Sequence, residues 1–470
     1  MQVIELILPE LFLSISILTL LILGAFVKKN YKIVQNLTLI VLLFTMLLFF
    51  NLPNENIKLF NQSFIIDDLS IFMKILTLVS CFFVMISSNE YIKTNSINNF
   101  EYPILILSSL LGMMIMISSY DLIIFYMGLE LQSLSLYVLS AIKRDNIRSS
   151  EAGLKFFVLS ALSSGLLLYG CALIYGFTGS TNFDVISDNL KESNIGSIFG
   201  VVFIITGLAF KISAVPFHMW APDVYEGSPT SVTSFLVLVP KIAAISIIIR
   251  FMYVPFINII NQWQLIIIFL SIASMVLGAV AAIGQSNIKR LMAYSSIGHM
   301  GYALAGIATG TISGINSTII YLIIYLIMNL GVFACIFSMR RKNIYFENID
   351  DLAGLSKQRP LLSFGFLIFM FSLAGVPPLA GFFAKFYIFM AVIESKMYLL
   401  AIIGLVTTVV SAFYYLRIVK IIYFDESIEF FEENRDLGIK ISLVLSCLAV
   451  LLYFVYPSVL TDLIPLINIK

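Results

Sequence analysis

Residues 361–392 read LLSFGFLIFMFSLAGVPPLAGFFAKFYIFMAV, an apolar stretch that the sequence GVPPLAG interrupts at residues 375–381. Proline removes a backbone donor and clashes with the preceding helical turn, so two adjacent prolines between glycines predict an interrupted helix. The stretch is about 30 residues long, whereas a helix that crosses a bilayer needs about 20. Lys385 follows the interruption. Interrupted membrane helices beside a charged residue are typical of ion pathways in transporters.

The whole chain has the composition of an integral membrane protein. Of its 470 residues, 60% are hydrophobic and 12% are charged, about half the charged fraction of a soluble domain. The net charge of +1 and the lack of a long basic run argue against a nucleic-acid partner. The four cysteines lie singly and the chain has two histidines, so we expect no metal site and no bound cofactor within it.

About fourteen apolar stretches have the length of a membrane span, and the first is too long for the apolar core of a signal peptide. They lie at residues 3–27, 33–50, 66–88, 103–118, 121–142, 153–177, 196–219, 230–253, 262–283, 288–308, 315–339, 361–392, 398–423 and 438–460. We therefore expect an all-α membrane protein with about 14 transmembrane helices. Most of the 28 basic residues fall in the loops on one side of these spans. Because basic loops stay in the cytoplasm, both termini are expected on the periplasmic side of a bacterial inner membrane.

Four charged residues lie deep inside these stretches: Glu130, Lys211, Lys241 and Lys385. A charge in hydrocarbon costs from about 2.5 to over 10 kcal/mol, so charges kept there usually have a function. Three of the four are lysines, and a desolvated lysine can release its proton whereas arginine cannot. The pattern favours movement of protons or cations across the membrane.

Lys74 is another basic residue inside a predicted span, and we interpret it as structural. It lies near a helix start, six to seven residues after Asp67 and Asp68. We expect its side chain to reach the membrane surface or to pair with one of these aspartates.

Glu130 lies about 14 Å along the helix that begins at Asp121, close to the middle of the membrane. It belongs to a polar stripe at steps of four and three residues, which places the stripe on one helix face. The stripe comprises Tyr126, Glu130, Ser133, Tyr137 and Ser140. Hydroxyl groups alone would also suit helix packing, but the carboxylate favours a functional site.

Lys211 and Lys241 each lie close to a proline. In FKISAVPFH at residues 210–218, Pro216 predicts a broken helix in the middle of a span. Pro240 directly precedes Lys241 and predicts a second local break. A kink that serves only helix packing is the alternative for Pro216.

The two histidines, His218 and His299, are weaker candidates. A lone histidine in a helical protein is more often a satisfied polar group than a proton relay. His299 nevertheless shares a helix face with Ser295 and Tyr302, at steps of four and three residues. Tyr321, Tyr325 and Asn329 form a second polar stripe at steps of four, and together the two stripes predict a hydrated chain through the second half of the protein.

The broken helices at Pro216 and Pro377 recur about 160 residues apart, each as the fourth span of a five-helix group. The two groups occupy residues 103–253 and 262–423. Because five is odd, the groups enter the membrane from opposite sides, which predicts an inverted repeat. Three helices in residues 1–102 precede the repeats, and one helix in residues 424–470 follows them.

These features resemble the antiporter-like subunits of respiratory complex I and of Mrp-type cation/proton antiporters. The resemblance rests on FYMGLELQSLSLYVL (125–139), FKISAVPFHMWAPDVYEGSPT (210–230), SNIKRLMAYSSIGHMGY (286–302) and GVPPLAGFFAKF (375–386), and it covers about residues 101–424. Within the family, PDVYEGSPT and the lysine at 385 are most similar to the subunit N branch of the bacterial NADH–quinone oxidoreductases. Pro240 departs from the pattern of the family.

The resemblance implies a proton-translocating membrane subunit whose pumping is driven by electron transfer from NADH to quinone. NADH, FMN, iron–sulfur clusters and quinone are then expected in partner subunits, and the partners are the other membrane subunits of complex I. The implied proton relay comprises Glu130, Lys211, Lys241 and Lys385, with His218, Lys289 and His299 as accessory positions.

Two alternatives remain open. The chain could be a subunit of a Mrp-type sodium/proton antiporter, which has no redox partners. It could also be a purely structural membrane subunit, in which the buried charges only fix helix packing.

Overall fold

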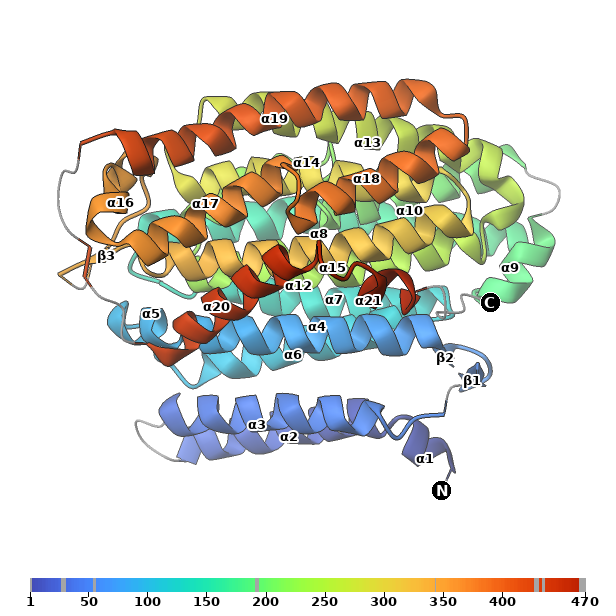
Figure 1. The fold of residues 1–470 in the computed structure, drawn as a ribbon. Helices are drawn as coiled ribbons and strands as arrows, with labels where there is room; N and C mark the ends of the chain where they lie inside the picture. The colour runs from blue at the N-terminus through green and yellow to red at the C-terminus, as the bar shows by residue number, and fades with distance from the viewer. Residues whose placement is uncertain are drawn as a thin grey trace.

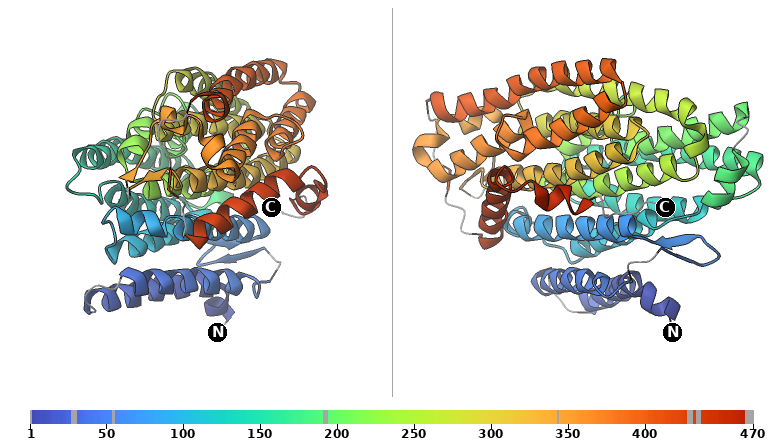
Figure 2. Two further views of the ribbon diagram at one scale, coloured as in Figure 1. Left: turned by 60° about the vertical axis from the view of Figure 1, so that its left-hand side comes forward. Right: turned by 45° about the vertical axis from the view of Figure 1, so that its right-hand side comes forward.

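The computed structural model describes residues 2–26, 31–53, 56–190, 194–342, 344–426, 431–432 and 436–464. In this part of the chain the fold is mostly helical, and the strands form two short hairpins. Long helices lie side by side in one elongated bundle (Figures 1 and 2). Nine of the described helices are long and apolar enough to cross a membrane, and four shorter apolar helices accompany them. The predicted helical membrane fold is therefore confirmed.

The N-terminal helices form an outer layer of the bundle (Figure 1). Helices α2 and α3 pack against each other and against α4 and α6. A hairpin of β1 and β2 leads into α4. The elements are α1 (Gln2–Leu6), α2 (Leu8–Phe26), α3 (Tyr31–Phe49), β1 (Ile57–Leu59), β2 (Phe64–Ile66), α4 (Asp68–Ser87) and α5 (Asn89–Thr94).

The next group contains the first broken helix, which is formed by α10 and α11. Its last member, α12, is buried along its whole length and lies at the centre of the bundle. The elements are α6 (Glu101–Ile117), α7 (Leu122–Ser140), α8 (Ile147–Thr178), α9 (Phe183–Asn189), α10 (Ile195–Lys211), α11 (Trp220–Gly227) and α12 (Thr230–Tyr253).

The second group contains the other broken helix, formed by α17 and α18, so the break predicted at residues 375–381 is confirmed. Two short helices follow the group. The elements are η1 (Ile257–Ile259), α13 (Ile260–Ile283), α14 (Ile288–Ala308), α15 (Ile312–Ile336), β3 (Arg340–Arg341), β4 (Ile344–Tyr345), η2 (Ile349–Leu352), α16 (Leu355–Gln358), α17 (Pro360–Ala374), α18 (Ala380–Glu394), α19 (Tyr398–Phe424), α20 (Leu437–Leu452) and α21 (Ser458–Thr461).

The two ends of the bundle differ. One end carries the β1–β2 hairpin, and we call it the hairpin end (Figure 1). At the other end a single pocket brings together α5, the start of α14 and three cations, Lys143, Arg148 and Lys289. We call this the basic end.

The local break expected at Pro240 is wrong, because α12 continues through this residue. A proline at 240 leaves the carbonyl of Leu236 without its helical donor. The hydroxyl of Tyr225 donates to this carbonyl at 3.2 Å, and the hydroxyl of Tyr325 donates to the carbonyl of Val237 at 3.2 Å. The Tyr225 hydroxyl thus replaces the donor that proline removes, Tyr325 adds a second bond in the same turn, and the helix stays intact.

The pairing expected for Lys74 with Asp67 or Asp68 is also wrong. Lys74 is buried, and its Nζ lies 2.5 Å from Oε1 of Glu10 on α2. Asp67 instead accepts two hydrogen bonds from Arg250, at 2.8 and 2.9 Å. Arg250 lies in the last turn of α12, at the end of the predicted span 230–253, with 1% of its surface exposed. The planar guanidinium matches both carboxylate oxygens, which a lysine cannot do.

Breaking the Asp67–Arg250 pair is expected to destabilise the protein strongly. Arg250→Met leaves the carboxylate of Asp67 buried without its partner, which costs about 3–5 kcal/mol. The double variant Asp67→Asn/Arg250→Met removes both charges and keeps the cap on α4, so it should lose less.

Thermal unfolding in mild detergent, followed by the reaction of a thiol dye with the buried Cys81, Cys171 and Cys335, measures this difference. Lys420→Met, which breaks an exposed pair with Asp425, is the control and should have no measurable effect. A double variant that is no more stable than Arg250→Met would contradict the prediction.

Candidate functional site

The first broken helix presents Lys211 at the C-terminal end of α10. The chain turns away at Ser213, whose φ of 61° lies in the left-handed region. Side chains satisfy the backbone groups that the break frees. The indole of Trp220 donates to the carbonyl of Phe210 at 3.0 Å, and the backbone N–H of Val215 donates to Ser274 at 2.9 Å. These hydrogen bonds therefore stabilise the break and hold Lys211 in place.

Lys211 is held by hydroxyl groups. Its Nζ donates to Ser133 on α7 and to Ser160 on α8, both at 2.8 Å. Tyr137 donates to Ser160 at 2.5 Å, so the polar stripe predicted on α7 does face Lys211. Glu130 lies on the same helix, and its charge acts on Lys211. In the described structure, however, the two residues form no direct hydrogen bond or ion pair, and Oε1 of Glu130 is buried without a protein partner.

Lys241 lies at the centre of the bundle and is fully buried. Its Nζ donates to the hydroxyl of Ser296 on α14 at 2.6 Å. The ring of Tyr225 lies 5.6 Å from Nζ, a distance at which an aromatic face attracts a cation. Lys241 thus has a hydroxyl and an aromatic ring as neighbours.

His299 connects hydroxyl groups on three helices. Nδ1 lies 2.6 Å from the hydroxyl of Tyr321 on α15, and Nε2 lies 3.2 Å from the hydroxyl of Tyr415 on α19. The Tyr415 hydroxyl also lies 2.5 Å from Ser295. A neutral histidine donates with one ring nitrogen and accepts with the other, so this arrangement can pass a proton through the ring.

The second broken helix holds Lys385. Its Nζ donates to the carbonyls of Leu373 and Ala374, both at 3.0 Å, at the C-terminal end of α17. This end of a helix favours a positive charge. Gly375 ends α17 with a φ of 90°, and a Cβ atom there would lie 3.2 Å from the Lys385 side chain. The Tyr302 ring lies 5.2 Å from Nζ.

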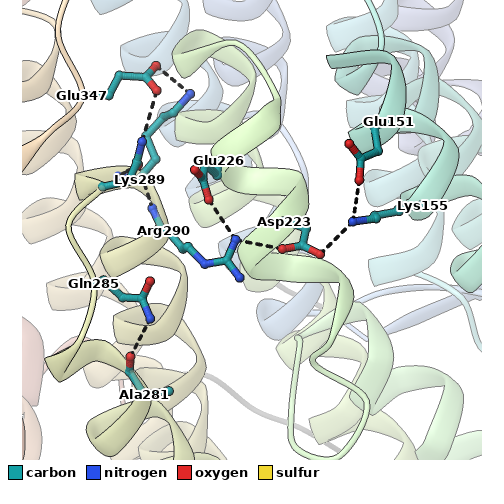
Figure 3. Close-up of polar contacts among 10 residues, drawn as sticks. Glu151, Lys155, Asp223, Glu226, Ala281, Gln285, Lys289, Arg290 and Glu347 are labelled. Carbon is teal, nitrogen blue, oxygen red and sulfur yellow. Dashed lines mark hydrogen bonds and ion pairs between the residues drawn. The ribbon is translucent and has the colours of Figure 1, made fainter. Parts of the chain in front are cut away.

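The other two accessory positions, His218 and Lys289, differ in their surroundings. His218 lies in the first break, partly exposed, with Nδ1 3.2 Å from the carbonyl of Pro216. Lys289 is buried in the first turn of α14, where Nζ lies 2.7 Å from Glu347 (Figure 3). Its Nζ also donates to the carbonyl of Ser228 at 3.0 Å.

Beside Lys289, an ion-pair network joins α8, α11 and α14 (Figure 3). Arg290 contacts Asp223 and Glu226 at 2.8 Å each, and Lys155 contacts Asp223 at 3.1 Å. The network therefore fixes α11, the second half of the first broken helix, to its neighbours on both sides.

The sequence did not identify three hydroxyl groups of the site. Ser160, Ser296 and Tyr415 contact Lys211, Lys241 and His299, respectively. Ser160 carries a weak signal, because Ser163 and Ser164 follow it on α8 and are buried. Isolated serines on apolar helices are otherwise common in packing and give no such signal.

No metal site is found in the described ranges, where no three His, Cys, Asp or Glu side chains gather. The described cysteines are unpaired thiols.

Comparison with known proteins identifies the family. The family described as "NADH:quinone oxidoreductase/Mrp antiporter, TM" matches residues 119–411. NADH-quinone oxidoreductase subunit N of Pelagibacter ubique is 61% identical over 464 residues, which cover 98% of both chains. The protein of the same name from Parvibaculum lavamentivorans is 53% identical over 455 residues, 96% of this chain and 94% of the other.

Solved structures show the same fold. A chain of respiratory complex I from Thermus thermophilus superposes with a TM-score of 0.84 at 28% identity, covering 98% of this chain and all of the other. A chain of the Mrp complex from Dietzia sp. gives 0.86 at 21% identity, covering 98% and 96%, a likeness of fold alone. The chain therefore belongs to the NADH-quinone oxidoreductase subunit N family, within the wider family of antiporter-like membrane subunits.

Proposed function

We propose that this chain is a proton-translocating membrane subunit of an NADH–quinone oxidoreductase and acts beside other membrane subunits of that complex. The identity of 61% to a subunit N over nearly the whole chain supports this assignment. The chain itself moves protons. NADH, FMN, iron–sulfur clusters and quinone belong to partner subunits, where the redox chemistry takes place.

One contrast among the buried cations carries the proposal. Cations that only stabilise the fold are paired with carboxylates here, as Lys74 is with Glu10 and Arg250 with Asp67. Lys211, Lys241 and Lys385 donate to neutral hydroxyl and carbonyl groups instead. No carboxylate of the described residues binds these lysines directly, so no ion pair holds them in the charged form, which is what a relay requires.

The relay proceeds from Lys211 through Lys241 to Lys385. The Tyr225 hydroxyl lies near both Ser213 and Ser296, between the first two lysines. Ser213 Oγ is buried without a protein partner in the described structure, so a water molecule is the expected bridge. Ser296 and His299 on α14 lead on towards Lys385. Glu130 modulates Lys211 through its charge, and His218 and Lys289 serve as accessory groups.

The relay spans two inverted five-helix repeats, residues 103–253 and 262–423, within fourteen spans that include residues 1–102 and 424–470. A backbone motif that occurs once in each group of helices supports the repeat. In both groups a loop pairs with the residues at the start of a helix. We call this motif the strap. In each strap two backbone bonds join a loop to a helix start, and the second pair lies 166 residues after the first. The bonds are Leu122 N–Thr181 O with Phe183 N–Tyr120 O, and Ile288 N–Glu347 O with Ile349 N–Ser286 O.

The two straps support an inverted arrangement. The first strap contacts the β1–β2 turn through Asn182 and Gln62 at the hairpin end. The second contains Glu347, which lines the pocket at the basic end. Because basic loops stay inside, the basic end faces the cytoplasm and the N-terminus the periplasm.

Lys211→Arg tests the relay. Arginine keeps the positive charge but does not release a proton at physiological pH. In inverted membrane vesicles, NADH-driven acidification should fall by at least about tenfold, a barrier increase of ~1.4 kcal/mol. Lys420→Arg at an exposed position is the control. Acidification at the wild-type rate in Lys211→Arg would disprove a relay through this lysine.

Tyr415→Phe tests the link that the Tyr415 hydroxyl on α19 makes to Ser295 and His299 on α14. The change removes the hydroxyl that contacts both Ser295 and His299 and keeps the ring. We expect proton pumping and NADH oxidation to slow together by about tenfold or more, because general acid–base groups contribute at least this much. Tyr169→Phe, with an exposed ring on α8, should leave both rates unchanged. Equal rates in the two variants would remove Tyr415 from the relay.

A further inference from the structure

Lys289 differs from the three relay lysines because its partner is a carboxylate. The side chain is 3% exposed and lies between Glu347 and the carbonyl of Ser228. Glu347 is more accessible, with 28% of its side chain exposed. Thr230 on α12 donates to the same carboxylate at 3.2 Å. The ion pair thus closes the space between the starts of α12 and α14 at the basic end.

Outside this ion pair lies a pocket of about 140 Å³. Much of its lining is polar or charged, with Asn95, Lys143, Arg148 and Glu226 opposite Lys289 and Glu347. Its volume holds several water molecules, each of which needs about 30 Å³, and the lining offers them hydrogen-bond partners. Glu347 therefore both lines the pocket and contacts Lys289.

On the side of the ion pair that faces the middle of the bundle, α14 connects Lys289 to the relay. Ser296 lies seven residues after Lys289, which is two turns along the same helix face and about 10 Å away. Ser296 accepts the hydrogen bond from Lys241. Two hydroxyls at the start of α12, those of Ser228 and Ser231, are buried without a protein partner in the described structure. A short polar route thus separates Lys289 from Lys241.

The other strap shows that the ion pair is not needed to build this corner. At the equivalent positions the first strap has Thr181 in place of Glu347 and Ile123 in place of Lys289. Ile123 is 60% exposed, and Thr181 donates to the cap residue Asp121. The same backbone bonds form in both straps, so the charges at the basic end serve another purpose.

We propose that Glu347 and Lys289 form a proton-entry gate that admits protons from the pocket at the basic end to Lys241; this inference rests on the proposed function. A proton from pocket water neutralises the Glu347 carboxylate and releases Lys289 from the ion pair. The Lys289 ammonium then passes a proton inward, through Ser296 and water, to neutral Lys241. Lys289 regains a proton from Glu347, and the ion pair closes again. The net change is one proton moved from the pocket to Lys241.

Glu347→Gln in the complete complex tests the gate. The amide cannot carry the proton, so NADH oxidation and acidification in inverted vesicles should both fall by about tenfold. Added formate, a small carboxylate that fits the pocket, should restore much of the rate, and Glu347→Asp should retain part of it. The control is Glu151→Gln, which removes a carboxylate at the same end from Lys155, an exposed lysine that keeps Asp223.

Wild-type rates in Glu347→Gln would overturn the gate, and so would a loss that neither formate nor Glu347→Asp reverses, since that is the mark of a structural role. If the single variant fails to assemble, Lys289→Met/Glu347→Gln removes both charges. This double variant should be slow and insensitive to formate, and wild-type rates in it would also overturn the gate.

Lys241→Met separates the gate from the relay. If pumping survives Lys241→Met, the proposed relay itself is wrong. If pumping is lost in Lys241→Met but persists in Glu347→Gln, only the gate is wrong.

Discussion

A bilayer offers no water to a buried polar group, so every interrupted helix must find its hydrogen bonds inside the protein. This constraint explains the position of Lys385. The break in α17–α18 frees the carbonyls of Leu373 and Ala374, and the lysine donates to both. The same groups that the break leaves unpaired hold the charge, so the break and the buried lysine stabilise each other.

The kind of partner separates Lys74 and Arg250 from the three relay lysines. A buried carboxylate fixes the charge of a buried cation, because separating the pair costs several kcal/mol. Arg250 and Lys74 are fixed in this way and hold α12 and α4 in place. Hydroxyl and carbonyl partners tolerate both charge states. The serines around Lys211 and Lys241 therefore matter as much to the proposed chemistry as the lysines themselves.

The length of the apolar stretches predicted a helical membrane fold, and the prolines at 216, 377 and 378 predicted both broken helices. The count of fourteen spans stays a prediction. Partners from distant parts of the sequence were not predictable. The sequence around Pro240 contains no sign that Tyr225 and Tyr325 supply the missing hydrogen bonds. Hydropathy likewise gave no sign that Arg250 pairs with Asp67 at the start of another helix. The charged residues of the site were found because charge is rare in a span, whereas serine is not.

The repair of α12 at Pro240 has a mechanical consequence. One donor, Tyr225, comes from α11 in the first group of helices, and the other, Tyr325, comes from α15 in the second. Both act on the turn directly before Lys241. The turn that carries Lys241 is thus bonded to both halves of the protein. A movement of either group of helices along the membrane normal would therefore move Lys241 as well, although this residue belongs by sequence to the first group alone.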